Sequence, residues 1–273
     1  MSMNSFHARQ TKPRSAPTPR AGRGSDISRA DVLLVQQGLA VSRTEAQGFI
    51  RAGRVAWAGG AVSKPAQELP AGTSLTLAMP DENVYVSRGG LKLAGALRES
   101  GLPVAGRVCL DVGQSTGGFS DCLLQTGAAR VVGVDVGHGQ LHPSLAKDAR
   151  VTAFEGINCR ALTAAELGAA MPCAGFDLIV ADVSFISLTL VLPRLPALLG
   201  MEGEMLLLVK PQFELGPGSV GKGGIVRDPA LYADVERRMR VCAHALQLKV
   251  RGWFNSPIAG SDGNREFFIW ISS

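Results

Sequence analysis

The chain contains no apolar stretch long enough to cross a lipid bilayer. Its most apolar later segment, residues 185–199, is interrupted by Pro193, Arg194 and Pro196, whereas a spanning helix needs about 20 consecutive apolar residues. The first residues also lack the apolar segment of a signal peptide. Both absences predict a soluble, cytoplasmic protein.

Cysteine and histidine patterns typical of metal sites are missing as well. The five cysteines are odd in number and never form Cys-x-x-Cys, which indicates neither a zinc site nor a disulfide framework and fits a reducing cytosol. His138 and His142 are four residues apart, but no glutamate stands beside either, as it would in His-Glu-x-x-His. We therefore expect no metal.

Charge of one sign is concentrated only at the amino terminus. Residues 1–25 hold five Lys or Arg residues and no acidic residue, which accounts for the whole net charge of +5. The segment is nearly free of apolar residues, so we expect a disordered basic tail. It favours a polyanionic partner weakly, and a solvated leader explains it at least as well.

The stretch from Leu110 to Asp135 carries the most informative pattern. A short apolar run leads into a glycine turn with Gly113, Gly117 and Gly118, and after an amphipathic segment a second apolar run ends on Asp135. This order is the plan of a βαβ nucleotide site, with a carboxylate where a ribose diol binds. The glycine spacing disfavours NAD and a Walker loop, which leaves S-adenosylmethionine as the natural candidate. An ordinary tight strand-to-helix connection is the alternative.

A second glycine-rich segment, Gly216 to Lys222, matches the first part of a phosphate-binding loop. Gly223 stands where Ser or Thr would ligate magnesium, and no helix clearly follows. The segment therefore predicts a mobile, substrate-facing loop rather than a site that hydrolyses ATP or GTP.

From Tyr85 onwards, apolar runs alternate with helical patterns, which predicts a Rossmann-like α/β domain with a mostly parallel sheet and helices on both faces. A helix opened by Ser87 comes first. Seven strands, a number that fits S-adenosylmethionine-dependent methyltransferases, are expected at residues 107–111, 131–135, 151–154, 177–182, 204–210, 248–254 and 265–271. Ligands gather at the carboxyl ends of such strands. The charged residues expected there are Asp111, Asp135, Asp182 and Lys210.

A smaller α+β module is expected at residues 26–80, with a linker at 81–86 before the larger domain at 87–273. Ser28 is expected to cap a first helix. Ser42 is expected to cap a second, with Glu45 reaching back as in a capping box. The patterns also predict a hairpin over residues 55–64 and a strand over residues 75–77.

The module resembles an S4 RNA-binding domain in the order Arg29-x-Asp31-x-Leu-Leu, Gly38-x-x-x-Ser42-Arg43-x-x-Ala46, Ile50-x-x-Gly53-x-Val55 and Val62-x-Lys64-Pro65. The resemblance implies RNA contacts from Arg43, Arg51, Arg54 and Lys64. These would be phosphate contacts, which give affinity and salt dependence but little sequence reading. A small helix-hairpin domain with a solvated basic edge is the alternative.

Six motifs of the larger domain are Ser87-Arg-Gly-Gly-x-Lys92-Leu, Leu110-Asp-Val-Gly-x-Ser-Thr-Gly-Gly-Phe119, Val134-Asp-Val-Gly137, Ala181-Asp-Val-Ser-Phe-Ile-Ser187, Val209-Lys-Pro-Gln-Phe-Glu214 and Gly221-Lys-Gly-Gly-Ile-Val-Arg-Asp228. Together with the module, they resemble the TlyA family, in which an S4 domain is fused to an FtsJ-like ribose methyltransferase. The resemblance implies 2′-O-methylation of cytidine ribose in ribosomal RNA, with S-adenosylmethionine as cofactor and ribosomal subunits as partners.

The resemblance also implies the residues of the site. A catalytic tetrad would consist of Lys92, Asp182, Lys210 and Glu266. The implied cofactor-binding residues are Asp111, Gly113, Ser115, Thr116, Gly117, Gly118, Asp135 and Asp182. Gln114 departs from the family, which more often has a small residue there, and is expected to crowd the methionine moiety without abolishing binding.

The chemistry explains the residue types of the tetrad. A ribose hydroxyl is a poor nucleophile at neutral pH and needs a base within hydrogen-bonding distance. We expect Lys210 to be that base in its neutral form, with Lys92 favouring this form and holding the oxyanion. Asp182 and Glu266 would orient the lysines, but their negative charge opposes the neutral form of Lys210. Whether the pKa of Lys210 is lowered therefore stays open.

Three other functions compete with this one. A non-catalytic RNA-binding or ribosome-assembly factor with a degenerate methyltransferase domain is disfavoured because all four tetrad positions are filled. Members of the family are also called haemolysins, but neither a spanning helix nor a strongly basic amphipathic helix supports membrane lysis. A pseudouridine synthase is not supported, because this chain has no Arg-Leu-Asp catalytic segment. The modified nucleotide, its subunit and the oligomeric state stay open.

Replacing Arg43 and Arg51 together by Ala is expected to weaken binding to ribosomal RNA and to reduce the salt dependence of binding by a slope of about two, because two phosphate contacts are lost. Filter binding at several salt concentrations would measure this. The affinity for S-adenosylmethionine, measured by calorimetry, should not change. Loss of cofactor binding would mean that the module has a different role.

Overall fold

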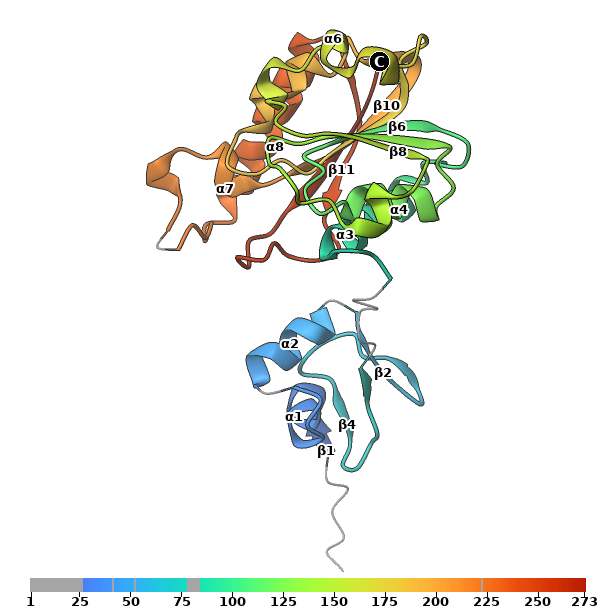
Figure 1. Ribbon diagram of the computed structural model, residues 1–273. Coiled ribbons are helices and arrows are strands. Elements are labelled where there is room, and N and C mark those ends of the chain that lie inside the picture. The colour runs from blue at the N-terminus through green and yellow to red at the C-terminus, as the bar shows by residue number, and fades with distance from the viewer. Residues whose placement is uncertain (1–26, 41, 52, 78–83, 222) are drawn as a thin grey trace, which may run out of the picture. The chain divides into compact units, whose positions relative to one another are not determined.

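The computed structural model describes residues 27–40, 42–51, 53–77, 84–221 and 223–273, and the chain divides into two compact units, residues 1–78 and 79–273 (Figure 1). Each unit has its own hydrophobic core. The predicted basic tail and part of the predicted linker lie outside the described residues.

The described residues of the smaller unit form two helices and two small antiparallel sheets. Helices α1 (Ala30–Gln36) and α2 (Arg43–Arg51) pack against each other around Leu34 and Ile50. The strands are β1 (Ile27–Arg29), which pairs with β4 (Glu68–Pro70), and β2 (Val55–Trp57), which pairs with β3 (Gly60–Ala61) and β5 (Thr76–Leu77). The predicted helices, hairpin and third strand are confirmed, whereas the sequence patterns did not indicate the β1–β4 pair.

The two helix starts differ in how well the sequence predicts them. Ser28, the expected cap of α1, lies in β1 opposite Leu69, and the helix begins at Ala30 without a side-chain cap, so this prediction is wrong. Pairing with β4 keeps the Ser28 backbone extended as part of a strand. Ser42 does cap α2, because its Oγ accepts a hydrogen bond from the Glu45 N–H at 3.2 Å.

A buried carboxylate joins the two helices of this unit. The fully buried Asp31 side chain accepts hydrogen bonds from Arg29 and Gln47 at 2.9 Å and from Arg43 at 3.2 Å. The Arg29 guanidinium, helped by Gln47 and Arg43, holds the pKa of Asp31 well below its usual range against the effect of burial. Arg43, which the sequence assigns to RNA, therefore also stabilises the α1–α2 pair.

The larger unit is built on a seven-stranded sheet in the order β11-β12-β10-β9-β6-β7-β8. The strands are β6 (Val108–Val112), β7 (Arg130–Val134), β8 (Val151–Phe154), β9 (Phe176–Ala181), β10 (Leu199–Val209), β11 (Lys249–Asn255) and β12 (Phe267–Ser272). Only β12 runs against its neighbours within the described sheet. The predicted α/β fold and its seven strands are confirmed; β10 begins several residues earlier than expected.

Helices cover both faces of this sheet (Figure 1). Successive strand residues alternate between the faces, so Leu206 of β10 packs with α3 (Arg88–Ser100) and α4 (Gly118–Gln125), whereas Leu207 packs with α8 (Ala230–Ala245). Shorter helices are α5 (Pro143–Ala146), α6 (Ala164–Leu167) and α7 (Pro211–Glu214). None of the helices in the described ranges combines the length and apolar character that crossing a bilayer requires.

The strand order brings distant segments to one edge of the sheet. The chain runs from β6 outward through β7 and β8 and returns at β9 on the other side of β6, which creates the reversal point where such sheets bind ligands. Because β12 is antiparallel to β10, Phe267 is the register partner of Val209. Glu266 and Lys210 are therefore neighbours at the edge that holds the ends of β6 and β9.

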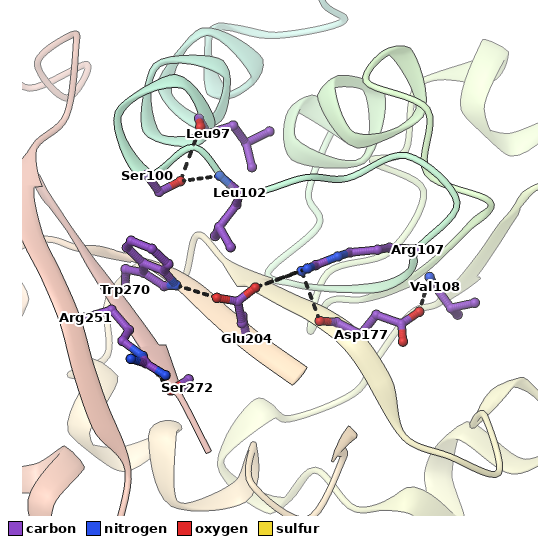
Figure 2. A network of polar contacts seen from close by, with 10 residues as sticks. All are labelled: Leu97, Ser100, Leu102, Arg107, Val108, Asp177, Glu204, Arg251, Trp270 and Ser272. Carbon is purple, nitrogen blue, oxygen red and sulfur yellow. Dashed lines mark hydrogen bonds and ion pairs between the residues drawn. The ribbon is translucent and has the colours of Figure 1, made fainter. Parts of the chain in front are cut away.

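A polar network ties together the opposite edge of the sheet (Figure 2). Arg107 donates two hydrogen bonds to one carboxylate oxygen of Glu204, both at 3.1 Å, and the Trp270 indole donates to the other oxygen at 3.1 Å. Nearby, the Val108 N–H donates to Asp177 at 2.8 Å. Glu204 thus connects β10 with β12 and with the residue that precedes β6.

Replacing Glu204 by Ala is expected to lower the free energy of unfolding of the larger unit by about 1–3 kcal/mol, because Arg107 and Trp270 lose a largely buried acceptor. Urea denaturation followed by tryptophan fluorescence would measure the change. Glu202→Ala, at an exposed position of the same strand, is the matched control and should have little effect. Equal losses for both variants would contradict the role of the network.

Candidate active site

The four residues of the implied tetrad meet at the ligand-binding edge as two ion pairs. Lys92 Nζ lies 2.6 Å from Glu266 Oε2, and Lys210 Nζ lies 2.6 Å from Asp182 Oδ1. Lys92 comes from α3, while Asp182 follows β9, Lys210 follows β10 and Glu266 precedes β12. Four separate segments thus place two cations and two anions in contact.

Three of these four side chains are largely removed from water, while the Asp182 side chain is 21% exposed. Lys92 and Lys210 are each 9% exposed and Glu266 is 4% exposed. Burial raises the pKa of the Glu266 carboxyl, and the charges of Lys92 and Lys210 oppose that rise. Removing any one partner would leave a buried charge unpaired, which is strongly unfavourable. The pairs therefore hold one another in place.

Ser184 is a member of the site that the sequence reading does not single out. Its Oγ accepts a hydrogen bond from Lys210 Nζ at 2.6 Å, so Asp182 and Ser184 hold the lysine together. Val183 between them is buried, which continues the alternation of β9 past its end. A hydroxyl two residues after a carboxylate at a strand end is the signal that could have identified Ser184.

The predicted glycine turn lies beside the tetrad. Gly113 has a φ of 84°, and a Cβ there would lie 2.7 Å from the Asp182 carbonyl oxygen, so glycine is required for this close approach. The backbone N–H groups of Ser115 and Gly137 donate to the two carboxylate oxygens of Asp135 at 2.8 Å and 2.7 Å. Asp135 therefore orders the turn from the neighbouring strand.

Two adjoining cavities border this turn. The first has a volume of about 390 Å³ and the second of about 450 Å³. Residues that line both are Gly113, Ser115, Asp182 and Ser184; Lys92, Thr116, Gly118 and Lys210 line only the first of the two, and Asp135 lines only the second. Gly117 lines neither, because the space that its Cβ would fill belongs to Leu141 and Leu145. Most of the residues implied for cofactor and catalysis thus share one continuous wall.

Asp111 is not at a strand tip, as the sequence predicts, but inside β6. It is fully buried and lines neither cavity. Its Oδ2 accepts a hydrogen bond from Ser120 Oγ at 2.7 Å, while its Oδ1 has no hydrogen-bond partner among the described residues. Burial raises the pKa of Asp111 to about 7. The carboxyl group therefore connects β6 to the first turn of α4, behind the glycine turn.

Gln114 lies against the sheet, and that it crowds the methionine moiety stays a prediction. Its amide Nε2 donates to Ser120 Oγ at 2.7 Å. A Cβ on Gly133 of β7 would lie only 2.0 Å from the Gln114 amide carbon, so the glycine makes room for the amide. Gln114 still borders the first cavity.

A third cavity, of about 390 Å³, extends from the tetrad to the glycine-rich loop. Lys92, Lys210 and Gly224 are among the residues that line it. Asn264 holds the loop, because its Nδ2 donates to the Gly224 carbonyl and its Oδ1 accepts from the Val226 N–H, both at 2.9 Å. Lys222 lies outside the described residues. That this loop faces substrate stays a prediction.

The residues implied to contact RNA all lie in the smaller unit. Arg43, Arg51 and Lys64 are exposed, and Arg51 donates to Gln47 on the same helix at 3.3 Å. The Arg54 guanidinium lies 4.6 Å from the centre of the Phe49 ring. Arg43 also forms an ion pair with Asp31. If substitution of Arg43 weakens RNA binding, the stability of the smaller unit must therefore be measured as well.

Comparison with known proteins places these features in context. The sequence matches the family model of FtsJ-like methyltransferases over residues 85–273 and that of the S4 domain over residues 28–75. The 16S/23S rRNA (cytidine-2'-O)-methyltransferase TlyA of Mycobacterium tuberculosis is 45% identical over 249 residues, 89% of each chain. Hemolysin A of Brachyspira hyodysenteriae is 37% identical and covers 88% of this chain and 97% of its own. A solved structure from Streptococcus thermophilus, named provisionally as a hemolysin, has a TM-score of 0.67 at 38% identity and covers 92% of this chain and 90% of its own.

Replacing Asp111 by Asn is expected to change how stability depends on pH. The pKa of about 7 in the folded protein exceeds the ordinary value of 3.8, so the folded state binds the proton more tightly. The resulting stabilisation is complete below the ordinary pKa and is lost as the pH rises through 7. The amide of the variant cannot ionise and does not lose stability in this way. The Tm of the variant minus that of the wild-type protein should therefore increase by several degrees between about pH 5 and pH 8. Thermal unfolding at both pH values tests this; a pH-independent difference would contradict it.

Proposed function

Because the chain belongs to the FtsJ-like methyltransferase family and carries an S4 domain, we propose that it transfers a methyl group from S-adenosylmethionine to the 2′-hydroxyl of a cytidine in ribosomal RNA. The observation that carries the proposal is the two buried lysine–carboxylate pairs beside the glycine turn. A relative that is 45% identical over nearly the whole chain is named for this reaction. The substrate would be a ribosomal subunit in the cytoplasm.

The first two cavities fit the chemistry of S-adenosylmethionine. Each oxygen of Asp135 accepts one backbone N–H and keeps a lone pair for a ribose hydroxyl. Val183 and Ile186 give the second cavity an apolar wall for an adenine ring. Thr116 and the backbone around Gly118 would hold the methionine part in the first cavity. When bound, the cofactor supplies a methyl group on a sulfonium leaving group.

Lys210 is placed to take the proton of the ribose hydroxyl. It lines the first cavity, on the cofactor side, and also the third. Neutral Nζ accepts the proton as the new oxygen–carbon bond forms, and Asp182 stabilises the resulting ammonium group. The hydrogen bond with Ser184 restricts the direction of Nζ. Alignment of the reacting atoms then contributes much of the rate.

Lys92 and Glu266 form the second half of the catalytic group. The Lys92 ammonium provides positive charge where negative charge develops on the ribose oxygen. Glu266 fixes the position of Lys92 through their 2.6 Å ion pair. Because both side chains are largely buried, their interaction is stronger than that of a surface pair.

The smaller unit would supply affinity for RNA. Exposed Arg43, Arg51 and Lys64 are suited to phosphate groups. Such contacts hold the RNA without selecting a nucleotide, so the selection of the methylated residue falls to the larger unit.

A non-catalytic ribosome-assembly factor is the main competing function. Such a protein would need the RNA-binding unit but gain nothing from four charges packed together with little water. Buried ion pairs often contribute little net stability, so their presence favours a chemical role.

Replacing Lys210 by Ala is expected to reduce methyl transfer by about 100-fold or more, because the general base is lost. Lys210→Arg should be similarly impaired, since a guanidinium keeps the charge but cannot accept a proton. Incubation of each variant with labelled S-adenosylmethionine and unmethylated ribosomal subunits measures the rate.

The matched control is Lys249→Ala, at an exposed position of β11, which should retain the wild-type rate. A Lys210→Arg variant with full activity would contradict the base role and leave only a role of the charge. No transfer by the wild-type protein to either ribosomal subunit would favour the assembly factor.

A further inference from the structure

The third cavity lies next to the reaction centre but does not touch the glycine turn. It shares Lys92, Ser184 and Lys210 with the first cavity, and its remaining wall includes Phe185, Gln212 and Phe213. The volume, about 390 Å³, lies within the range that small-molecule sites occupy. It therefore provides space beside the base Lys210 for a group other than the cofactor.

Gln212 lines this cavity, and a hydrogen bond fixes the orientation of its side-chain amide. Its amide Nε2 donates to Asp262 Oδ2 at 3.1 Å. Burial acts to raise the pKa of Asp262, but hydrogen bonds from Asn264 and Gln212 outweigh it and lower that pKa. An ionised carboxylate can only accept hydrogen bonds, so the NH₂ end of the Gln212 amide must face Asp262. The carbonyl oxygen is the end that remains.

The carbonyl oxygen Oε1 of Gln212 is buried and has no hydrogen-bond partner among the residues that the structure describes. A buried acceptor without a donor costs free energy, which a ligand with an N–H group in the right place would recover. Phe213 lies one residue further along α7, and its ring centre is 5.2 Å from that of Phe185. The two rings give the cavity an apolar wall suited to a flat heteroaromatic group.

We propose that the third cavity is the subsite for the base of the target nucleoside, and that Gln212 Oε1 accepts a hydrogen bond from the exocyclic amino group of cytosine. This inference rests on the proposed ribose methylation. Uracil carries a carbonyl oxygen in place of that amino group, so two acceptors would face each other and uridine would be rejected. Gln212 is thus a specificity-determining residue, and Asp262 is the residue that positions it.

Replacing Gln212 by Leu is expected to lower kcat/KM for cytidine methylation by about 10- to 100-fold, because the amino group loses its acceptor. Calorimetry should show unchanged affinity for S-adenosylmethionine. Ribosomal subunits are the probe: after reaction they are digested, and 2′-O-methylcytidine and 2′-O-methyluridine are quantified by mass spectrometry. The mapped cytidine is then replaced by uridine, and the measurement is repeated.

Asp262→Ala is the second variant; it retains the Gln212 side chain but removes the carboxylate that orients its amide. Without the carboxylate the amide can rotate and offer NH₂ to a uracil oxygen, so the preference for cytidine over uridine should fall by about tenfold or more while methylation continues. Gln140→Leu, in the second cavity, is the comparison: it should alter cofactor affinity without changing the choice of base. Tm values of all variants establish that they fold.

The outcomes separate the two proposals. If the wild-type protein forms no 2′-O-methylcytidine, the proposed function fails. If it does, but Gln212→Leu and Asp262→Ala both keep the wild-type kcat/KM and the wild-type preference for cytidine, the base subsite is wrong. Equal methylation of cytidine and uridine by the wild-type protein would overturn it as well.

Discussion

The pairing of Lys92 with Glu266 and of Lys210 with Asp182 is the constraint on which this edge of the sheet depends. The contacts with Glu266 and Asp182 stabilise the charged form of Lys92 and the protonated form of Lys210 in a site with little water. That requirement fixes the sheet: a last strand parallel to β10 would begin at the opposite edge and carry Glu266 away from Lys92. The antiparallel β12 therefore positions Glu266 next to Lys92 as well as completing the sheet.

The segments that carry the charged residues are themselves tied together. Glu214, at the end of α7, is buried and accepts hydrogen bonds from Ser187 Oγ at 2.5 Å and from the Leu188 N–H at 2.7 Å. The turn after β10 is thus bonded to the segment after β9. Movement of one segment would displace Lys210, Ser184 and the wall of the third cavity together.

The sequence predicts those parts of the molecule that depend on local patterns. Strands with two buried faces give apolar runs, and charged residues that end such runs converge for topological reasons, so Asp182 and Lys210 could be placed from the sequence. Pairing between side chains depends on packing between distant segments. For that reason the sequence predicts neither the hydrogen bond between Lys210 and Ser184 nor the orientation of the Gln212 amide. Asp111 was misplaced because one residue of difference in the strand end turns an edge residue into a buried one.

Gln114 and Gly133 restrict each other across two strands. The amide occupies the volume that a side chain at position 133 of β7 would need, so such a side chain would have to displace the amide and its hydrogen bond to Ser120. A chain with a small residue at 114 would be free of this restriction and could accept a methyl group at 133. A glycine in the middle of a strand weakens strand propensity. Gly133 is therefore explained by the space that the Gln114 side chain occupies next to it. A substitution of Gly133 is therefore expected to be tolerated better when residue 114 is small.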